Sequence, residues 1–339
     1  MYSALYVEKE VRSHERVRKL VSRFAGVPIV EIERFGEIFN RRHQNFRLQK
    51  KAPALILAEK HGTRVLPAPA GYGFSESNSY YFSHMYNCVY DCRYCFLQGM
   101  YRSANYVLFV NYEDFAEDIE RVIAESPRDS VFYSGYDCDS LAMEPTSQFA
   151  GYFLEQFAKW PQATLELRTK STQVRSLLNR QAIPNCIVAM SFTTESAGMR
   201  WENGVPTLGK RLQALSRLQA AGWKVALRFE PIIPSPGVVN ECEALFERVF
   251  EVVDSASLHS ASLGKFRMPK GYYKRTARLY PDDPLYARDT IVRDGMVEID
   301  PGEDAASLLS RLENTLLRWV SGEQYYRCED AQVSDTNGE

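Results

Sequence analysis

The sequence contains no long apolar segment and no surplus of basic residues. Its 41 lysine and arginine residues face 43 acidic residues, which gives a net charge of −2. The chain therefore has no global polycationic character, and any attraction to nucleic acid must come from a local basic surface. The longest apolar runs, such as residues 52–58, are far shorter than the roughly 20 residues of a membrane span. We expect no membrane partner.

Targeting and nucleotide-binding signatures are also missing. The first residues reach the charged Glu8 without the apolar core of a signal peptide, which predicts a cytoplasmic protein with reduced thiols. The seven cysteines therefore need a role other than disulfide formation. Gly135 and Gly264 follow predicted strands but belong to no G-x-G-x-x-G or Walker pattern.

Apolar runs typical of buried strands alternate with helical patterns along most of the chain. We predict strands at residues 106–110, 130–134, 164–168, 187–192, 224–229 and 257–263. Helices are predicted between them at residues 112–126, 145–159, 173–180, 208–221 and 240–254, with a final helix at 305–319. This alternation predicts an α/β fold, a partial or full (βα) barrel of about six parallel strands.

Residues 1–75 differ from this pattern. They include a basic amphipathic stretch at 11–24 and a short strand candidate at 29–32, and a loop rich in proline and glycine follows at 67–73. We expect an N-terminal elaboration at residues 1–75, a barrel with C-terminal elements at 76–328, and a disordered polar tail at 329–339.

Three cysteines, Cys88, Cys92 and Cys95, follow one another with the spacing C-x3-C-x2-C. Three thiolates on one short loop can converge on a single soft metal centre. Structural zinc usually completes a tetrahedron with a second Cys or His pair, which is missing, although His84 could serve as the fourth ligand. A 4Fe-4S cluster held by three cysteines leaves one iron open to an external ligand. Cys186, Cys242 and Cys328 are scattered, and we interpret them as core or surface thiols.

The cysteine loop resembles the cluster motif of radical S-adenosylmethionine enzymes. In that superfamily the open iron binds the amino and carboxylate groups of S-adenosylmethionine, and electron transfer produces a 5′-deoxyadenosyl radical. The resemblance implies a 4Fe-4S cluster and S-adenosyl-L-methionine as cofactors. It also implies that Phe96, directly after the third cysteine, contacts the adenine.

The run CVYDCRYCFLQ at residues 88–98 resembles the signature of the spore photoproduct lyase family. FYSGYDCDSLAME at 132–144, LRTK at 167–170, AMSF at 189–192 and GKFRMPK at 264–270 match that family in the same order. The resemblance covers about residues 82–328. It implies a lyase that repairs a UV-induced thymine dimer in DNA and takes electrons from a donor such as flavodoxin or ferredoxin.

Residue roles carried over from this family fall on several positions. Lys170 would bind the carboxylate of S-adenosylmethionine, and Ser191 would hydrogen-bond the cofactor. The hydrogen-donor cysteine of the family falls on Tyr136, whereas Cys138 falls where the family has a cofactor-contacting serine. If this segment is extended, both side chains share one face, so Cys138 or Tyr136 could donate hydrogen.

The aromatic residues of the cysteine loop also bear on the radical chemistry. Phe96 replaces a family tyrosine whose hydroxyl is proposed to join a radical relay, and Tyr94 is retained.

Two basic segments without Asp or Glu predict local contact with nucleic acid. Residues 255–281 interleave cations with aromatic residues, and we expect DNA contacts from Lys265, Arg267, Lys270, Tyr273, Lys274 and Arg275. Residues 38–58 are likewise free of acids and include Arg41, Arg42 and Arg47. A solvated face is the alternative explanation for both segments.

Three hypotheses about function remain open at this point. The first is a radical enzyme that repairs DNA, with damaged DNA as its partner. The second is a radical enzyme that acts on another nucleic acid, a peptide or a small molecule. The third is a non-enzymatic DNA-binding protein stabilised by zinc.

Overall fold

The computed structural model describes residues 2–69, 72–73, 78–126, 128–302 and 305–328, so the predicted tail at 329–339 lies outside the described residues. Its larger sheet has eight strands in the order β18-β14-β13-β11-β10-β9-β5-β4. Their bounds are β4 Val65–Pro67, β5 Asn78–Phe82, β9 Ser130–Ser134, β10 Ala163–Thr169, β11 Cys186–Phe192, β13 Lys224–Ile232, β14 Ser260–Lys265 and β18 Tyr325–Arg327. Every pairing is parallel except that between β4 and β5.

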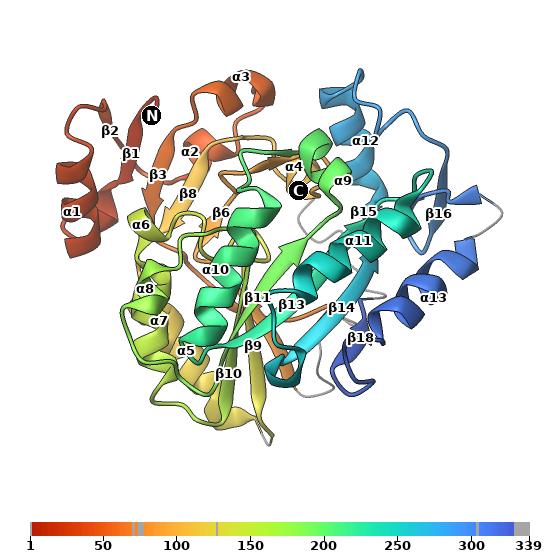
Figure 1. The fold of residues 1–339 in the computed structure, drawn as a ribbon. Helices are drawn as coiled ribbons and strands as arrows, with labels where there is room; N and C mark the ends of the chain where they lie inside the picture. Colours follow the sequence, from red (N-terminus) through yellow and green to blue (C-terminus); the bar gives the residue numbers. More distant parts are fainter. Residues whose placement is uncertain (1, 70–71, 74–77, 127, 303–304, 329–339) are drawn as a thin grey trace.

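The larger sheet curls into a partial barrel whose outer face is covered by helices (Figure 1). In the described residues β18 and β4 are the two edges of the sheet, so the barrel does not close. The main helices are α5 Tyr112–Glu125, α6 Glu144–Ser147, α7 Phe149–Phe157, α8 Arg175–Leu178, α10 Leu208–Ala220, α11 Val238–Phe250 and α13 Ala305–Leu316. The prediction of a partial βα barrel with a C-terminal helix is confirmed, with β5 and β18 as additional parallel strands.

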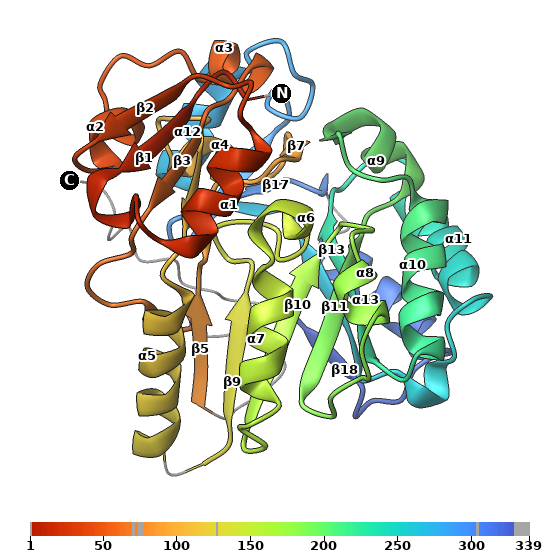
Figure 2. The ribbon, with the colours of Figure 1, turned by 90° about the vertical axis from the view of Figure 1, so that its left-hand side faces the viewer.

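A second sheet of five strands lies beside the barrel (Figure 2). Its order is β2-β1-β3-β8-β6, with β1 Leu5–Glu8, β2 Ile29–Ile32, β3 Leu55–Ala58, β6 Met85–Tyr86 and β8 Tyr106–Phe109. The short helices of this part are η1 Lys9–Val11, α1 Glu15–Arg23, α2 Gly36–Phe39 and α3 Phe46–Lys51. The sheet is thus built mainly from the first 58 residues, and β6 and β8 complete it.

The prediction that residues 106–110 begin the barrel series is wrong. β8 pairs with β3 and β6 in the second sheet, and the barrel begins with β5, which runs parallel to β9. The apolar run of β8 fits any buried strand, so its pattern does not reveal which sheet it joins. β5 has the sequence NSYYF and is only partly buried, so it has little of the hydrophobic signal of a barrel strand.

The predicted helices are present, although they are shorter than predicted and one of them is broken. In α5 the side chains of Phe115, Ile119 and Ile123 are four residues apart and buried against the core. The predicted helix at 145–159 is instead two helices, α6 and α7, because Gln148 between them has a left-handed backbone with φ of 52°. None of the helices in the described part of the chain has the length and apolar character that a transmembrane span requires.

Smaller elements surround the carboxyl ends of the barrel strands. They are β7 Asp91–Cys92, α4 Leu97–Met100, α9 Glu195–Trp201, β12 Glu202–Asn203, β15 Arg267–Pro269, α12 Lys270–Leu279, β16 Thr290–Arg293 and β17 Met296–Ile299, whereas the short η2 Ser255–Ser257 precedes β14 at the amino ends of the strands. Helix α4 packs closely on α12, since a Cβ at Gly99 would lie 2.3 Å from the backbone oxygen of Tyr272. Glycine at this position therefore fixes how near the two helices approach.

The barrel interior contains a buried ionic network. Arg228 on β13 and Glu166 on β10 are both fully buried, and Arg228 Nη2 lies 2.7 Å from Glu166 Oε2. Arg168 Nη2 lies 3.0 Å from the other oxygen of Glu166, and its Nη1 lies 3.6 Å from Glu230 Oε2. Two parallel strands thus pair their inward-facing charges across the barrel.

Replacing Glu166 with leucine should strongly destabilise the fold, because two buried guanidinium groups would lose their shared carboxylate. We expect the free energy of unfolding to fall by about 3–5 kcal/mol, as measured by urea denaturation. The control is Glu155→Gln, which removes a surface partner 3.4 Å from Arg180 and should change the value by less than about 1 kcal/mol. Equal stabilities of the two variants would contradict a stabilising role for the network.

Candidate functional site

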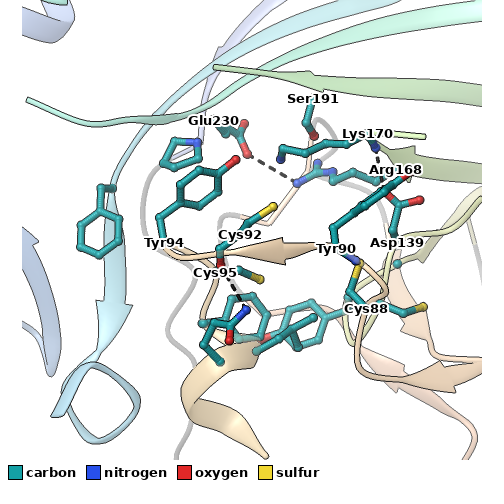
Figure 3. A pocket seen from close by; sticks show the side chains of 18 of the residues that line it. Cys88, Tyr90, Cys92, Tyr94, Cys95, Asp139, Arg168, Lys170, Ser191 and Glu230 are labelled. Carbon is teal, nitrogen blue, oxygen red and sulfur yellow. Dashed lines mark hydrogen bonds and ion pairs between the residues drawn. The ribbon is translucent and has the colours of Figure 1, made fainter. Parts of the chain in front are cut away.

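A cavity of about 280 Å³ opens at the carboxyl ends of the barrel strands. The three cysteines of the loop line it together with Lys170 and Ser191 (Figure 3). Phe96, Tyr136 and Cys138 also line it. These residues come from the cysteine loop, the segment after β9, the end of β10 and β11. The fold therefore brings the sequence-predicted cofactor residues together at the end of the barrel where sites of such folds lie.

The cysteine loop, residues 88–95, is fixed by hydrogen bonds within itself and to distant segments. The backbone nitrogen of Tyr90 donates to Cys88 Sγ at 3.4 Å, and β7 pairs with β12. Gln98 Nε2 donates to Asp91 Oδ1 at 3.0 Å and to the backbone oxygen of Cys92 at 3.3 Å. Gln98 belongs to the sequence motif without a predicted role, and these hydrogen bonds show that it braces the loop.

Burial raises the pKa of all three loop thiols, that of Cys88 to about 12. Lys170 opposes this effect at Cys92, and Lys50 opposes it at Cys88. Lys50 Nζ lies 3.4 Å from the backbone oxygen of Cys88. Binding of a metal must therefore displace protons from the thiols, and the two lysines stabilise the resulting negative charge.

The positions of the sulfur atoms suit a multi-iron cluster better than a single zinc ion. In the described residues, only Glu10, Glu59 and His61 bring three metal-binding side-chain atoms within 4.8 Å of one another, so the three loop sulfurs are more widely spread. Zinc bonds of about 2.3 Å in a tetrahedron place ligand sulfurs about 3.8 Å apart, whereas a cluster spreads its cysteine ligands over separate irons.

His84 is not available as a fourth zinc ligand on the cysteine loop. Its ring stacks on Phe149 at 3.8 Å, and its Nδ1 lies 3.9 Å from Cys138 Sγ. Burial lowers the pKa of His84 to about 3, so its ring is neutral at physiological pH.

Lys170 lies at the end of β10 and is held by a buried acid. Its Nζ lies 4.0 Å from Glu202 Oε1, and Arg211 Nη2 lies 2.8 Å from Glu202 Oε2. Tyr94 donates its hydroxyl hydrogen to the same carboxylate. Burial opposes ionisation of Glu202, but Lys170 and Arg211 outweigh it and lower its pKa below the usual value. Sequence reasoning missed Glu202, which holds Lys170 and Tyr94 together.

Tyr136 and Cys138 lie on the cavity wall but not on an extended strand. β9 ends at Ser134, and Gly135 turns the chain with φ of 90°, so the prediction of a shared strand face is wrong. The ring of Tyr136 contacts those of Tyr81 and Phe96, with centroids 4.5 Å and 5.6 Å away.

Cys138 is 5% exposed, and burial raises its pKa well above the usual value, so it is a protonated thiol. Its contact with His84 and its burial place it deeper in the wall than Tyr136.

Cys328 also lines the cavity, so its interpretation as a scattered core or surface thiol is wrong, whereas Cys186 and Cys242 are core thiols as predicted. Cys328 follows β18 directly, and its Sγ accepts from Arg267 Nη2 at 3.9 Å. Its position after the predicted helix at 305–319 is the only sequence signal.

The predicted DNA-contact residues divide into two groups. Lys265 and Arg267 line the cavity, and Lys265 Nζ lies 2.7 Å from Glu298 Oε2.

The second group lies on α12, outside the cavity lining. Lys270 and Lys274 of this helix are exposed. Tyr273 packs on Tyr286 with centroids 5.2 Å apart, and Arg275 donates to the backbone oxygen of Met100 at 3.2 Å. The exposed lysines are therefore free to meet phosphates, whereas Tyr273 and Arg275 hold α12 in place.

Solved structures of spore photoproduct lyase superpose on almost the whole chain. One is a mutant with bound AdoMet and dinucleoside spore photoproduct, and it covers 97% of this chain and 98% of its own, with a TM-score of 0.80 and 18% identity. Another is a complex with dinucleoside spore photoproduct, with a TM-score of 0.80 and 19% identity. At these identities the likeness establishes the fold.

Curated relatives carry the same description. Spore photoproduct lyase of Bacillus subtilis (strain 168) is 23% identical over 164 residues, which is 48% of each chain. The protein of Geobacillus sp. (strain Y412MC61) is 24% identical over 203 residues, 58% of this chain and 59% of the relative. The chain thus spans about half the length of the curated relatives it matches.

The family model for spore photoproduct lyase matches residues 74–285, which is more than half of the chain. This range contains the cysteine loop, Lys170, Ser191 and most of the barrel strands. The chain therefore belongs to the spore photoproduct lyase family.

Proposed function

We propose that this protein is a radical S-adenosylmethionine enzyme that repairs a UV-induced thymine dimer in DNA. The observation that carries the proposal is one cavity lined by three loop thiols, by Lys170 and by Ser191. Family membership, and the AdoMet and spore photoproduct bound in a structure of similar fold, support the same cofactor and substrate.

Cys88, Cys92 and Cys95 would hold a 4Fe-4S cluster. When bound, the cluster supplies the electron that splits S-adenosylmethionine into methionine and a 5′-deoxyadenosyl radical. The chain provides buried thiols, hydrogen bonds to sulfur and nearby lysines. It also restricts access of water, since Cys92 and Tyr94 are only 6% and 7% exposed.

Lys170 and Ser191 would position S-adenosylmethionine. An ammonium group at the end of β10 attracts the carboxylate of the methionine part, and Glu202 fixes that ammonium group from one side. The Ser191 side chain lines the cavity, while its backbone oxygen accepts from Arg211 at 2.8 Å. The ring of Phe96 provides an apolar surface for the adenine. We propose cytoplasmic flavodoxin or ferredoxin as the source of electrons.

The cations at the cavity mouth would hold the DNA backbone. Exposed Lys270 and Lys274 are available for phosphates, while Lys265 and Arg267 line the cavity into which a dimer would swing. We further propose that residues 76–328 form the barrel that carries the catalytic residues. Residues 1–75 would be an N-terminal elaboration that also contributes Phe46 and Lys50 to the cavity, and β6 and β8 complete its sheet.

The hydrogen atom that completes repair would come from a thiol, because an S–H bond yields a hydrogen atom to a carbon radical more easily than a phenol does. Tyr136 occupies the position of the family cysteine and offers no thiol. Among the described residues, the thiols that line the cavity outside the cysteine loop are Cys138 and Cys328. Cys138 is tied to His84 deep in the wall. Cys328 adjoins Arg267 on the wall assigned to the substrate, and we propose it as the donor.

Hydrogen donation by Cys328 conserves atoms and electrons. The S–H bond of Cys328 breaks and a C–H bond forms on the substrate radical, which leaves a thiyl radical. One electron from the low-potential reductant and one proton from water restore the thiol. Burial raises the pKa of Cys328 to about 12, so the thiol keeps its hydrogen at physiological pH.

Replacing any one of Cys88, Cys92 and Cys95 with alanine should abolish the brown visible absorbance of anaerobically reconstituted protein, because each cysteine holds a separate iron. Iron and sulfide analysis should give near four of each per wild-type chain. The control is Cys242→Ala, a core thiol away from the cavity, which should keep its absorbance. Full iron content in all three loop variants would remove the cluster hypothesis.

The donor is tested with Cys328→Ala, Cys138→Ala and Tyr136→Phe on a thymine-dimer oligonucleotide. We expect all three to cleave S-adenosylmethionine, and Cys328→Ala to change the distribution of repair products. Chromatography of the nucleoside products provides the measurement. If Cys328→Ala gives the same products as wild type and Cys138→Ala gives altered products, the hydrogen donor is Cys138.

A further inference from the structure

Helix α3, residues Phe46–Lys51, joins the second sheet to the cavity although it lies outside the residues that the family model matches. Phe46 is buried, and both Phe46 and Lys50 line the cavity. The side chain of Asn45 caps the helix by accepting from the backbone nitrogen of Leu48 at 3.1 Å. Helix α3 is therefore fixed at the cavity rim.

The outer side of α3 combines a large apolar residue with positive charge. Leu48 is two residues after the buried Phe46, so it points to the opposite side of the helix, and it is 59% exposed. Arg47 and Lys51, one turn apart on this outer side, are also exposed. An exposed leucine thus lies beside two exposed cations of the same helix, at the edge of the cavity.

The segment that carries Leu48 has charged side chains of one sign. Arg41 and Arg42 are exposed as well, and residues 38–58 contain no Asp or Glu. We call Arg41, Arg42, Arg47 and Lys51 the basic rim. Within the described residues, no member of the basic rim forms an ion pair.

The basic rim continues onto the other basic segment of the chain. The guanidinium of Arg47 lies 5.8 Å from the ring centroid of Tyr280, directly after α12. Figures 1 and 2 both show α3 and α12 at the same end of the molecule, and Phe46 and Lys50 of α3 line the cavity. The exposed Lys270 and Lys274 belong to α12 and add further cations to this end of the molecule.

We propose that Leu48 is a wedge that inserts between base pairs of duplex DNA, with the basic rim on the flanking phosphates. A polyanion with an apolar interior is the partner that suits an exposed leucine in a basic segment, because stacked bases lie between two charged backbones. Proteins that unstack base steps insert leucine, methionine or phenylalanine in this manner.

The wedge rests on the proposed function and extends it. A thymine dimer reaches a cavity inside a barrel only after it leaves the base stack. The departure of two bases leaves a gap, which Leu48, next to the cavity lining residues Phe46 and Lys50, is placed to fill. The wedge therefore stabilises the extruded state of the duplex and takes no part in the radical chemistry.

The main test compares two substrates. Leu48→Ala should lower repair of the lesion in a duplex by about tenfold or more, because the cost of unstacking is no longer offset. The same variant should repair the free dinucleoside photoproduct at the wild-type rate, because a dinucleoside needs no extrusion. Leu48→Met should restore duplex repair, and Leu317→Ala, at another exposed leucine, should leave both rates unchanged.

A binding measurement supplies a readout without the cofactors. A duplex with 2-aminopurine beside the lesion reports unstacking by a gain of fluorescence. At saturating protein, wild type should produce this gain and Leu48→Ala should not. Replacing Arg47 and Lys51 with glutamine should lower the salt slope of duplex binding by about 1.8, or about 0.9 for each phosphate that is no longer neutralised.

Three outcomes would overturn the wedge. In the first, Leu48→Ala repairs the duplex lesion as fast as wild type. In the second, Leu48→Ala loses the same fraction of its repair rate on the duplex and on the dinucleoside. In the third, binding to phosphatidylserine vesicles depends on Leu48, whereas the fluorescence change of the duplex does not. If wild-type protein repairs neither substrate, the proposed function fails, and the fluorescence response of Leu48→Ala still decides the wedge by itself.

Discussion

The cysteine loop, residues 88–95, depends on contacts from segments far away in the sequence. The backbone nitrogen of Arg93 donates to the oxygen of Trp201 at 2.9 Å, and its guanidinium lies 3.9 Å from the ring centroid of Tyr280. Tyr280 also donates its hydroxyl hydrogen to Gln98 at 3.1 Å. These contacts hold the three thiols toward the cavity, so the position of α12 and the geometry of the metal site are set together.

The same region must accommodate charge where little water enters. Lys50 and Lys170 approach the thiols from two sides, and the buried Glu202 and Arg211 compensate the charge of Lys170. Inside the barrel, the inward-facing charges of β10 and β13 neutralise one another, and two of them, Arg168 and Glu230, also line the cavity. Such a preorganised polar environment supports a charged cofactor without a shell of water around it.

Much of this arrangement could be predicted from local sequence. The barrel strands β9 to β14 are buried apolar runs, and the spacing of Cys88, Cys92 and Cys95 indicates one centre, because both signals are local. The role of Cys328 could not be predicted, since the pairing of β18 with β14 brings together residues that are about 60 positions apart. Likewise, the position of α3 next to Tyr280 depends on tertiary packing between two sheets.

The central claim is that this cavity converts a thymine photoproduct back to thymines. The direct measurement uses anaerobically reconstituted, reduced protein with S-adenosylmethionine and dinucleoside spore photoproduct, followed by chromatography of nucleosides. We expect loss of the photoproduct and release of the restored thymine dinucleoside, together with cleavage of S-adenosylmethionine. Cleavage of the cofactor with full recovery of unchanged photoproduct, under conditions in which the cluster is intact, would contradict the claim.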